Sequence, residues 1–525
     1  MFRNIFLIFI FFSSGLFAQE PLWERTTGGK YADFLTDGIS TMDYGFLLAG
    51  STLSDAGNIK NRGSYDYLLT KYTEDGDKEW SKLFGGLQTD LLRCILPDQD
   101  GGFLLGGISN SPEGGIKSLP GIGQFDIWLI KLDLDGNILW QRVLGGLASE
   151  DLSDIVSGVD GGYLIGGSSL SAVVLGGNKK ESPSGIIPKQ SLSYGHEDYW
   201  LIKLDASGQI QWQKSYGGSR KDVLKKIIPL REGGYILAGE SGSPAGGIKN
   251  TSLKGGNDWW IIRIDMQGNI LWQRTFGDEA EDILSSAIPT KDGNFLLGGY
   301  YTYIDTTSAK NTSDIVLRKI DIDGNLLWKE VYTGSTDDYL TGLLENPDGS
   351  LILGAYSAGL KKGKKSLKGK GTEDFLLIKT GENGQELWRQ SIGGIGKEVL
   401  KKVLLTRDGG YVLLGSSIAP GGKADMQSDF YMVKIGDKDK PVKEKFPLEA
   451  IPNPAVLYTQ AIIGRDYEKG RFRLFDLNGK VLEERELKGE RIIPINMSRY
   501  PNGIYLINVR ADDYNKSIKV LKSSH

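Results

Sequence analysis

The hydrophobic positions of this chain form short runs that return in the same order along most of its length. The phrase DIWLIKLDLDGNILWQRVLGG begins at Asp126, and close copies begin at Asp198 and Asp258. Each copy joins an aromatic-aliphatic run to a second run that carries tryptophan, through a turn that contains aspartate and glycine. The apolar residues do not follow helical spacing, and glycine bounds the runs. This pattern is typical of an all-β repeat.

Two residue types mark the copies at regular distances. Successive tryptophan anchors stand 56 to 72 residues apart, at Trp23, Trp80, Trp140, Trp212, Trp272, Trp328 and Trp388. The aspartates that open the aromatic run alternate with them, at Asp66, Asp126, Asp198, Asp258, Asp314, Asp374 and Asp429. Both series have seven members, which indicates seven copies of one unit.

Each copy reads as four short strands with turn signals between them. Turns such as DLDGN and DIDGN predict a hairpin between the aromatic strand and the tryptophan strand, because glycine supplies the positive φ. Four-stranded units of this length are typical of propeller blades. One such sheet cannot bury both of its faces alone, and a closed ring buries them for every sheet at once.

The two ends of the repeat predict how the ring closes. The last copy ends at DFYMVKIGD, which opens at Asp429, and no tryptophan strand follows it. A spare tryptophan strand, LWERTTGG, lies at the other end, around Trp23. We therefore predict an all-β fold with a seven-bladed β-propeller over residues 20–436, whose N-terminal strand completes the last blade.

The repeated phrases are similar to those of known propeller families. KLDLDGNILW resembles the turn-plus-tryptophan docking repeat of quinoprotein-type propellers, where the aspartate sits one residue further from the glycine. The whole unit, with its DGG[FY] and D-x-x-[LIV]-x-K-x-D segments, resembles the bacterial seven-bladed β-propeller repeat. This resemblance covers residues 20–436 and implies the fold, while it says almost nothing about an activity.

The repeat stops after Gly436, and a second domain follows. DKDKPVKEKF belongs to a charged linker with a proline, residues 437–447. In residues 448–525 the phrases RFRLFDLNGKVL, YPNGIYLINV and KSIKVLK alternate as strands joined by Asn-Gly turns. A small β-sandwich is expected.

These C-terminal phrases resemble, in the same order, the type A sorting domain of the type IX secretion system of Bacteroidetes. The matching residues are Pro452, Asn453, Pro454, Asp476 to Gly479, Gly503, Ile504, Tyr505 and the segment from Lys519 to Lys522. The resemblance implies delivery of the rest of the chain across the outer membrane, with the secretion machinery as partner, and frequent removal of the domain. Ser523, Ser524 and His525 extend past the lysine at which members commonly end. An adhesive Ig-like module is the alternative.

The N-terminus and the composition indicate the cellular location of the protein. Residues 1–18 combine Arg3, a short apolar run and the small residue Ala18, which predicts a secretory signal peptide rather than a membrane anchor. We expect a secreted or outer-membrane surface protein without a transmembrane segment after signal removal. A net charge of −4 gives no reason to expect nucleic acid as a partner. One cysteine, Cys94, and two histidines exclude a disulfide framework and leave little for His- or Cys-based metal sites.

An acid opens the strand that we expect to be innermost in every copy. The series is Asp33, Asp90, Asp151, Asp222, Asp282, Asp338 and Glu398. A ring of carboxylates near an axis would suit a hard cation such as Ca²⁺. The acids also follow Gly-Gly or similar turns, and their carboxylates can accept hydrogen bonds from the N–H groups of these turns. Because all seven copies share the feature, we favour the structural role and expect neither a resident metal nor another cofactor.

Asymmetry between the copies is the better guide to a binding site, and it lies in the loops between the second and third strands. By strand alternation these loops share one face of the ring, here called the loop face, and the tight turns share the other, the turn face. One long loop holds Lys179, Lys180, Tyr194 and His196. Another holds Lys361, Lys362, Lys364, Lys365, Lys368 and Lys370, either as a solvated run or as a site for an anionic polymer.

The functional hypothesis is a binding or scaffold protein with a glycan or protein ligand on the loop face. No GxSxG, HExxH, phosphate-binding loop or CxxC motif is present. The alternative is an extracellular lyase or glycosidase that acts on polysaccharide. A quinone-dependent enzyme, suggested by the tryptophan repeat alone, is a third hypothesis. The repeated tryptophans themselves are expected to pack between blades rather than to stack on sugars.

Overall fold

The structure is a computed structural model of the chain. It describes residues 20–41, 43–56, 59–98, 102–133, 136–158, 160–172, 185–305, 310–334, 337–358, 373–418, 428–436, 448–451, 453–455, 458–464 and 467–523. The predicted signal peptide, residues 1–18, and the linker, residues 437–447, lie outside this set. The regular elements of the described residues are β-strands, and none of these residues forms a helix long and apolar enough to cross a membrane.

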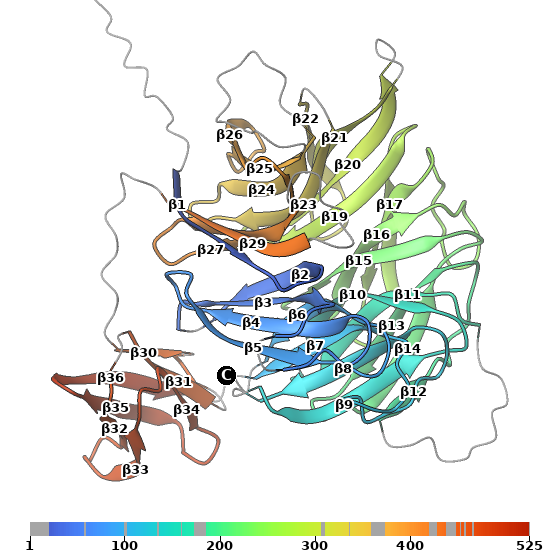
Figure 1. Ribbon diagram of the computed structural model, residues 1–525. Helices are drawn as coiled ribbons and strands as arrows, with labels where there is room; N and C mark the ends of the chain where they lie inside the picture. The colour runs from blue at the N-terminus through green and yellow to red at the C-terminus, as the bar shows by residue number, and fades with distance from the viewer. Residues whose placement is uncertain are drawn as a thin grey trace, which may run out of the picture.

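The strands before residue 437 form antiparallel sheets of four, which fan out around a centre (Figure 1). In the N-terminal half, one sheet contains β2 (Asp33–Ser40), β3 (Phe46–Thr52), β4 (Asp66–Tyr72) and β5 (Lys78–Phe84). The next contains β6 (Asp90–Pro97), β7 (Phe103–Ser109), β8 (Asp126–Leu132) and β9 (Ile138–Gly145). The one after it contains β10 (Glu150–Ser157), β11 (Tyr163–Ser169), β13 (Asp198–Leu204) and β14 (Ile210–Tyr216). A short strand, β12 (Ile186–Pro188), adds to β9 in parallel.

The following sheets repeat the same order. One contains β15 (Asp222–Pro229), β16 (Tyr235–Ser241), β17 (Asp258–Ile264) and β18 (Ile270–Phe276), and the next β19 (Glu281–Pro289), β20 (Phe295–Asp305), β21 (Lys310–Ile320) and β22 (Leu326–Tyr332). Another contains β23 (Asp338–Glu345), β24 (Leu351–Ser357), β25 (Asp374–Thr380) and β26 (Glu386–Ile392). The last contains β27 (Lys397–Leu405), β28 (Tyr411–Ile418), β29 (Ser428–Gly436) and β1 (Glu20–Thr27).

The first strands of successive sheets contact one another and line the centre. The contacts run from β2 to β6, β10, β15, β19, β23 and β27, and β27 in turn contacts β2. The chain of contacts therefore returns to its start, which is the arrangement of a propeller-type fold. The tryptophan strands lie at the far edge of their sheets, as the hairpin turns predicted, except that the short strand β12 adds beyond β9.

The N-terminal strand joins the sheet at the other end of the repeat. β1 pairs antiparallel with β29, so that Trp23 lies opposite Lys434 and Thr27 opposite Phe430. The prediction that the strand at Trp23 lies beside the segment at Asp429 is confirmed. Because β1 is outermost, β29 keeps no unpaired edge.

Burial on both faces explains why the aromatic runs do not alternate with polar residues. All positions of β4, β8 and β13 are buried, because each sheet packs against a neighbour on either side. The lysine near the end of these strands is buried as well and reaches the aspartate of the tight turn in its own sheet. The ammonium–carboxylate distances are 2.8 Å for Lys71–Asp43 and 2.8 Å for Lys203–Asp160. These pairs tie the two repeated sequence segments together on the turn face.

The C-terminal residues form two further sheets around a core of their own. One sheet has the order β30 (Leu448–Ile451), β31 (Tyr458–Ile463), β34 (Ile492–Asn496), and the other β33 (Val481–Leu487), β32 (Gly470–Phe475), β35 (Gly503–Ala511), β36 (Tyr514–Lys522). Ile463 and Ile495 of the first sheet and Phe472 and Ile507 of the second belong to one buried cluster. The alternating burial of β32 and β35 shows that one face of the four-stranded sheet is solvated.

The C-terminal unit meets the turn face of the ring, close to β2–β5 (Figure 1). The Tyr44 hydroxyl donates to the Glu449 carboxylate, and the Arg407 guanidinium lies 4.0 Å from the centroid of the Tyr44 ring. Trp80, Phe103 and Gln460 line the cleft between the two units. The loop face is thus left uncovered by this unit.

Deletion of residues 20–27 tests the closure of the ring. We expect a lower urea midpoint and self-association, because β29 then presents an open strand edge that pairs with other chains. Chemical unfolding and size-exclusion chromatography measure both effects. The control is Leu22→Ala, which changes a side chain that is 55% exposed in the same strand and keeps the backbone ladder. A deletion variant that unfolds at the wild-type midpoint would contradict closure by β1.

Candidate functional site

The acids that open the innermost strands accept hydrogen bonds from the turns just before them. The donor is the backbone N–H four residues earlier, at 2.6 Å for Gly29–Asp33, 2.7 Å for Gly86–Asp90 and 2.7 Å for Gly218–Asp222. Asp282 and Glu398 accept in the same way, from Asp278 at 2.9 Å and Gly394 at 3.0 Å. Asp338 is buried at the corresponding position. The carboxylates therefore satisfy turn N–H groups, which is the structural role weighed for them.

Asp151 does not belong to this series. It is exposed, and its carboxylate lies 2.8 Å from Arg93. Glu150 is 2% exposed and accepts from the Gly146 N–H at 2.9 Å, so it takes the place that the sequence assigned to Asp151. Side chains alternate between the two faces of a strand, so a shift of one residue moves the acid to the other face.

A second acid faces each of these carboxylates across the boundary between sheets. It is the aspartate that opens the third strand of the preceding sheet, and glycine lies between the two. A Cβ on Gly145 would stand 2.0 Å from Asp126 Oδ1 and 2.8 Å from Glu150 Oε2. A Cβ on Gly393 would likewise stand 2.0 Å from Asp374 Oδ1 and 2.7 Å from Glu398 Oε2. The Gly-Gly turns thus make room for a pair of buried acids.

Burial raises the pKa of several of these acids, Asp66 and Asp338 among them. It raises the pKa of Asp66 to about 6, with the charge of Asp90 adding to the effect, and the pKa of Asp338 to about 6 with Asp314 adding to it. The Oδ1 atoms of Asp66 and Asp90 are buried without a hydrogen-bond partner within the described residues. When two carboxylates face each other in a site closed to water, the charge on one makes ionisation of the other less favourable.

Three buried lysines lie among the acids, and sequence reasoning missed them. The Lys117 ammonium donates to Ser109 Oγ at 2.9 Å and Ser111 O at 2.6 Å, while Lys189 and Lys249 reach the backbone oxygens of Ser171 and Ser243 at 2.7 Å and 2.5 Å. Burial lowers the pKa of all three, and nearby carboxylates oppose the effect.

Spacing was the signal that could have identified these lysines. Each stands nine residues before the aspartate that opens the next strand, as Lys117 does before Asp126. Lys365 has the same spacing before Asp374. Within the described part of the chain, no three His, Cys, Asp or Glu side chains are grouped so that they could hold a metal ion.

Few of the ligand-binding residues predicted for the loop face can be placed. Lys179, Lys180, Lys361, Lys362, Lys364, Lys365, Lys368 and Lys370 lie outside the described residues. Tyr194 is half-buried, and its N–H donates to Asp198 Oδ2 at 2.7 Å. His196 is exposed two residues further along the same loop. The structure gives Tyr194 a role in holding the loop end.

The repeated tryptophans dock on the hairpin turn of the next sheet. The indole N–H groups of Trp212 and Trp272 donate to the backbone oxygens of Met266 and Ile322 at 3.1 Å and 3.0 Å. A Cβ on Gly324, whose φ is +77°, would stand 2.9 Å from the Trp272 ring. The glycine of the turn therefore serves the tryptophan of the preceding sheet, and the expected packing role of these rings is confirmed.

The predicted sorting residues that the structure describes meet around β36. The Asn453 side chain donates to Lys519 O at 2.8 Å and accepts from the Leu521 N–H at 2.9 Å. The Tyr505 hydroxyl donates to Pro501 O at 2.6 Å. Gly479, with φ of +78°, shapes the turn before β33, and Gly503 is the first residue of β35. Pro454 follows Asn453 directly, and Pro452 lies outside the described residues.

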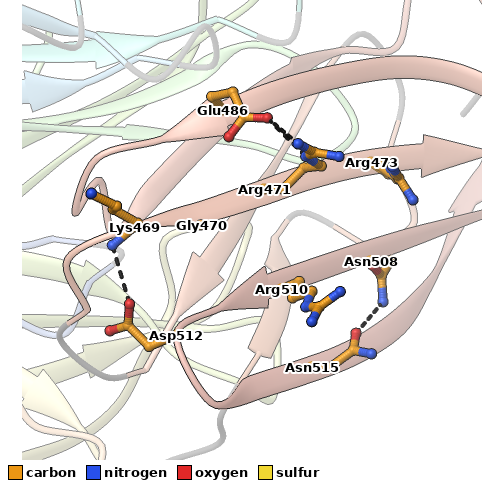
Figure 2. Close-up of a pocket in the computed structure, with 9 residues that line it drawn as sticks. All are labelled: Lys469, Gly470, Arg471, Arg473, Glu486, Asn508, Arg510, Asp512 and Asn515. Atoms are coloured by element: carbon orange, nitrogen blue, oxygen red, sulfur yellow. Dashed lines mark hydrogen bonds and ion pairs between the residues drawn. The ribbon is translucent and has the colours of Figure 1, made fainter.

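The solvated face of the four-stranded C-terminal sheet carries a row of arginines (Figure 2). Arg471 lies 2.6 Å from Glu486, and Arg473 lies 3.0 Å from Glu484. Asn508 donates to Asn515 at 2.9 Å across β35 and β36. Arg510 is exposed on the same face. The exposed ion pairs stabilise little, so the arrangement is a hydrated polar surface with donors for anionic groups.

Comparison with known proteins identifies the C-terminal unit. Residues 449–523 match the family described as "Secretion system C-terminal sorting domain". The chain therefore carries a sorting domain, which indicates an exported protein and an interaction with secretion machinery.

A curated relative matches part of the chain. The "Regulatory protein FlaEY" of Caulobacter vibrioides (strain ATCC 19089 / CIP 103742 / CB 15) is 24% identical over 243 residues, which cover 43% of this chain and 25% of that protein. The match thus spans a quarter of the relative's length.

Solved structures with a similar backbone differ widely in sequence. Hydrazine synthase of Kuenenia stuttgartiensis has a TM-score of 0.41 at 9% identity and covers 74% of this chain and 94% of that one. The NanB sialidase from Streptococcus pneumoniae has a TM-score of 0.38 at 8% identity and covers 79% and 70%. Identities this low carry no information on activity.

Asp66→Asn tests the buried acid pairs through the pH dependence of stability. The folded-state pKa of Asp66, about 6, lies above that of an unfolded aspartate, about 3.9. The stability that the pair contributes is therefore complete below about pH 4 and is lost as the pH rises through 6. Asparagine stays neutral, so the variant should lose less of its urea midpoint between about pH 4 and pH 7 than wild type does.

The matched control for this experiment is Asp55→Asn. Asp55 is an exposed carboxylate, and its hydrogen bond with Lys60 lowers its pKa. The pKa shift of Asp55 is therefore opposite in sign to that of Asp66. The control should follow the pH dependence of wild type. Identical slopes for wild type and Asp66→Asn would contradict a raised pKa at Asp66.

Proposed function

We propose that the chain is an exported seven-bladed β-propeller that acts as a binding or scaffold module at the cell surface or in the medium. Its ligand, a glycan or a protein, binds on the loop face. The C-terminal unit, a small β-sandwich, acts as a type A domain of the type IX secretion system of Bacteroidetes. No catalysis or cofactor belongs to this function.

The contrast between a repeated core and unequal loops carries the proposal. The acid pairs, the Lys–Asp pairs of the turn face and the docked tryptophans recur from sheet to sheet, so they serve the scaffold. The connections of the loop face differ in length and charge. Variable loops on a rigid scaffold are where binding sites usually occur. The C-terminal unit contacts the opposite face, which leaves the loop face open to a ligand.

Deletion of residues 448–525 tests delivery. We expect the truncated chain to remain in the cell envelope, because the segment that matches the sorting family is gone. Immunoblots of cells and medium from the native host measure the distribution. A reporter with an export signal, fused to residues 437–525, should gain release, and the same fusion with Asn453→Ala is the matched variant, since Asn453 bonds β36 twice. Release of the truncated chain at the wild-type level would contradict the proposal.

Incubation with a panel of polysaccharides separates a binder from an enzyme. The proposed function predicts retention of the full chain by a ligand without release of shorter products, because the described residues hold no group suited to a metal and the sequence has none of the catalytic motifs. Affinity electrophoresis measures retention, and chromatography of the incubated polysaccharide measures products. Turnover products would replace the binding function with a lyase or glycosidase activity.

A further inference from the structure

Three tyrosines from two neighbouring sheets meet at the loop-face end of the innermost strands. Tyr300 lies on β20, Tyr339 on β23 and Tyr356 on β24. The rings of Tyr300 and Tyr339 meet edge to face with centroids 5.1 Å apart, and those of Tyr339 and Tyr356 stack, also at 5.1 Å. All three side chains are half-buried.

Two of these tyrosines, Tyr300 and Tyr356, occupy one register position of the second strand. The other sheets hold Ser51, Ile108, Ser168, Glu240 and Ser416 there. Ser51, Glu240 and Ser416 accept from N–H groups of the next sheet, at 2.9 Å from Leu92, 3.1 Å from Leu284 and 3.2 Å from Leu35. Only the two adjacent sheets of Tyr300 and Tyr356 carry an aromatic ring at this position. A local difference between otherwise repeated units is expected at a functional site.

A carboxylate–lysine pair lies on each side of the three rings. Glu240 Oε1 is 3.3 Å from Lys225 Nζ, and Glu373 Oε1 is 2.7 Å from Lys397 Nζ. Burial raises the pKa of Tyr300, and the charge of Glu240 adds to the effect. Burial raises the pKa of Tyr356 to about 12, and Glu373 adds to it. The two carboxylates are thus close enough to act on the phenols, and each of them is paired with a lysine.

The hairpin beside this group extends further than its counterparts. β20 and β21 have 11 residues each, whereas β3 and β4 have 7. Figure 1 shows the hairpin projecting past the neighbouring sheets. It carries a second aromatic pair, Tyr301 and Tyr303, stacked at 5.3 Å, and Ile304 is 67% exposed. The hairpin forms a wall beside the three tyrosines.

We propose that Tyr300, Tyr339 and Tyr356 form the floor of a binding site for an uncharged carbohydrate chain, flanked by Glu240 and Glu373. The proposal rests on the proposed function and names its ligand class and site. A sugar ring presents C–H groups to an aromatic ring and hydroxyls at its rim, so tyrosine rings with their hydroxyls and flanking carboxylates match both parts. The lysine partners of the carboxylates favour a neutral polymer over an anionic one.

The test uses the full chain and affinity electrophoresis in soluble β-1,3-glucan, xylan, mannan and alginate. Wild type should be retarded by at least one of the three neutral polymers. Tyr339→Ala and the double variant Tyr300→Ala/Tyr356→Ala should bind it about tenfold more weakly, because each loses an aromatic contact. Tyr339→Phe keeps the ring and should lose less. The matched control is Tyr31→Ala, a tyrosine 49% exposed on the same face, which should bind as wild type does.

Each outcome decides between the site, the ligand class and the function. Retention that survives all three tyrosine changes would overturn this site and leave the binding function standing. Retention by alginate alone, abolished by salt, would overturn the uncharged ligand in favour of a charge-driven one. If none of the four polymers retards the wild-type chain, the carbohydrate ligand is overturned. A protein ligand whose binding is lost in the same tyrosine variants would then replace it. Urea midpoints of the variants equal to that of Tyr31→Ala show that losses come from the site.

Discussion

The constraint on which this molecule depends is that its sheets are apolar on both faces. A strand such as β8 is buried at every position, so the sheet that contains it needs a neighbour on either side. A linear stack would leave two faces in water, whereas contacts that return from β27 to β2 leave none. The same constraint explains why β1 is taken from the other end of the chain: without it, one sheet would lack its outer strand.

Close packing of sheets brings groups of like charge together, and the repeat contains the means to accommodate them. The aspartate that opens a third strand meets the acid that opens the next sheet, and only glycine leaves space between them. Burial then holds the pKa of acids such as Asp66 and Asp338 near 6. Buried lysines, of which Lys117 is one, place positive charge between some of the acids. The carboxylates are therefore part of the scaffold, and their pattern is not by itself a cation site.

Function is expected where the repeat is broken. The docked tryptophans and the Lys–Asp pairs serve the same purpose in successive sheets, so they carry no information on a ligand. The tyrosines of β20, β23 and β24 differ, because they form an aromatic cluster between two neighbouring sheets, and the other sheets carry no aromatic residue at the register position of Tyr300 and Tyr356. The C-terminal sorting domain contacts the turn face, away from them. The sorting domain and the proposed binding site therefore lie on opposite faces of the ring.

The sequence by itself determined the repeated unit, the hairpins within it and the partner of the strand at Trp23, because turn chemistry and hydrophobic runs are local and the repeat supplies several independent copies of each. It also located the sorting domain through phrases such as those around Asn453 and Tyr505. Only the tertiary structure decided that Glu150 rather than Asp151 joins the acid series, that Asp66 faces Asp90, and that Tyr300 meets Tyr339. These contacts join residues of different sheets, and the face on which a side chain lies changes with a single residue of register, which no local pattern encodes.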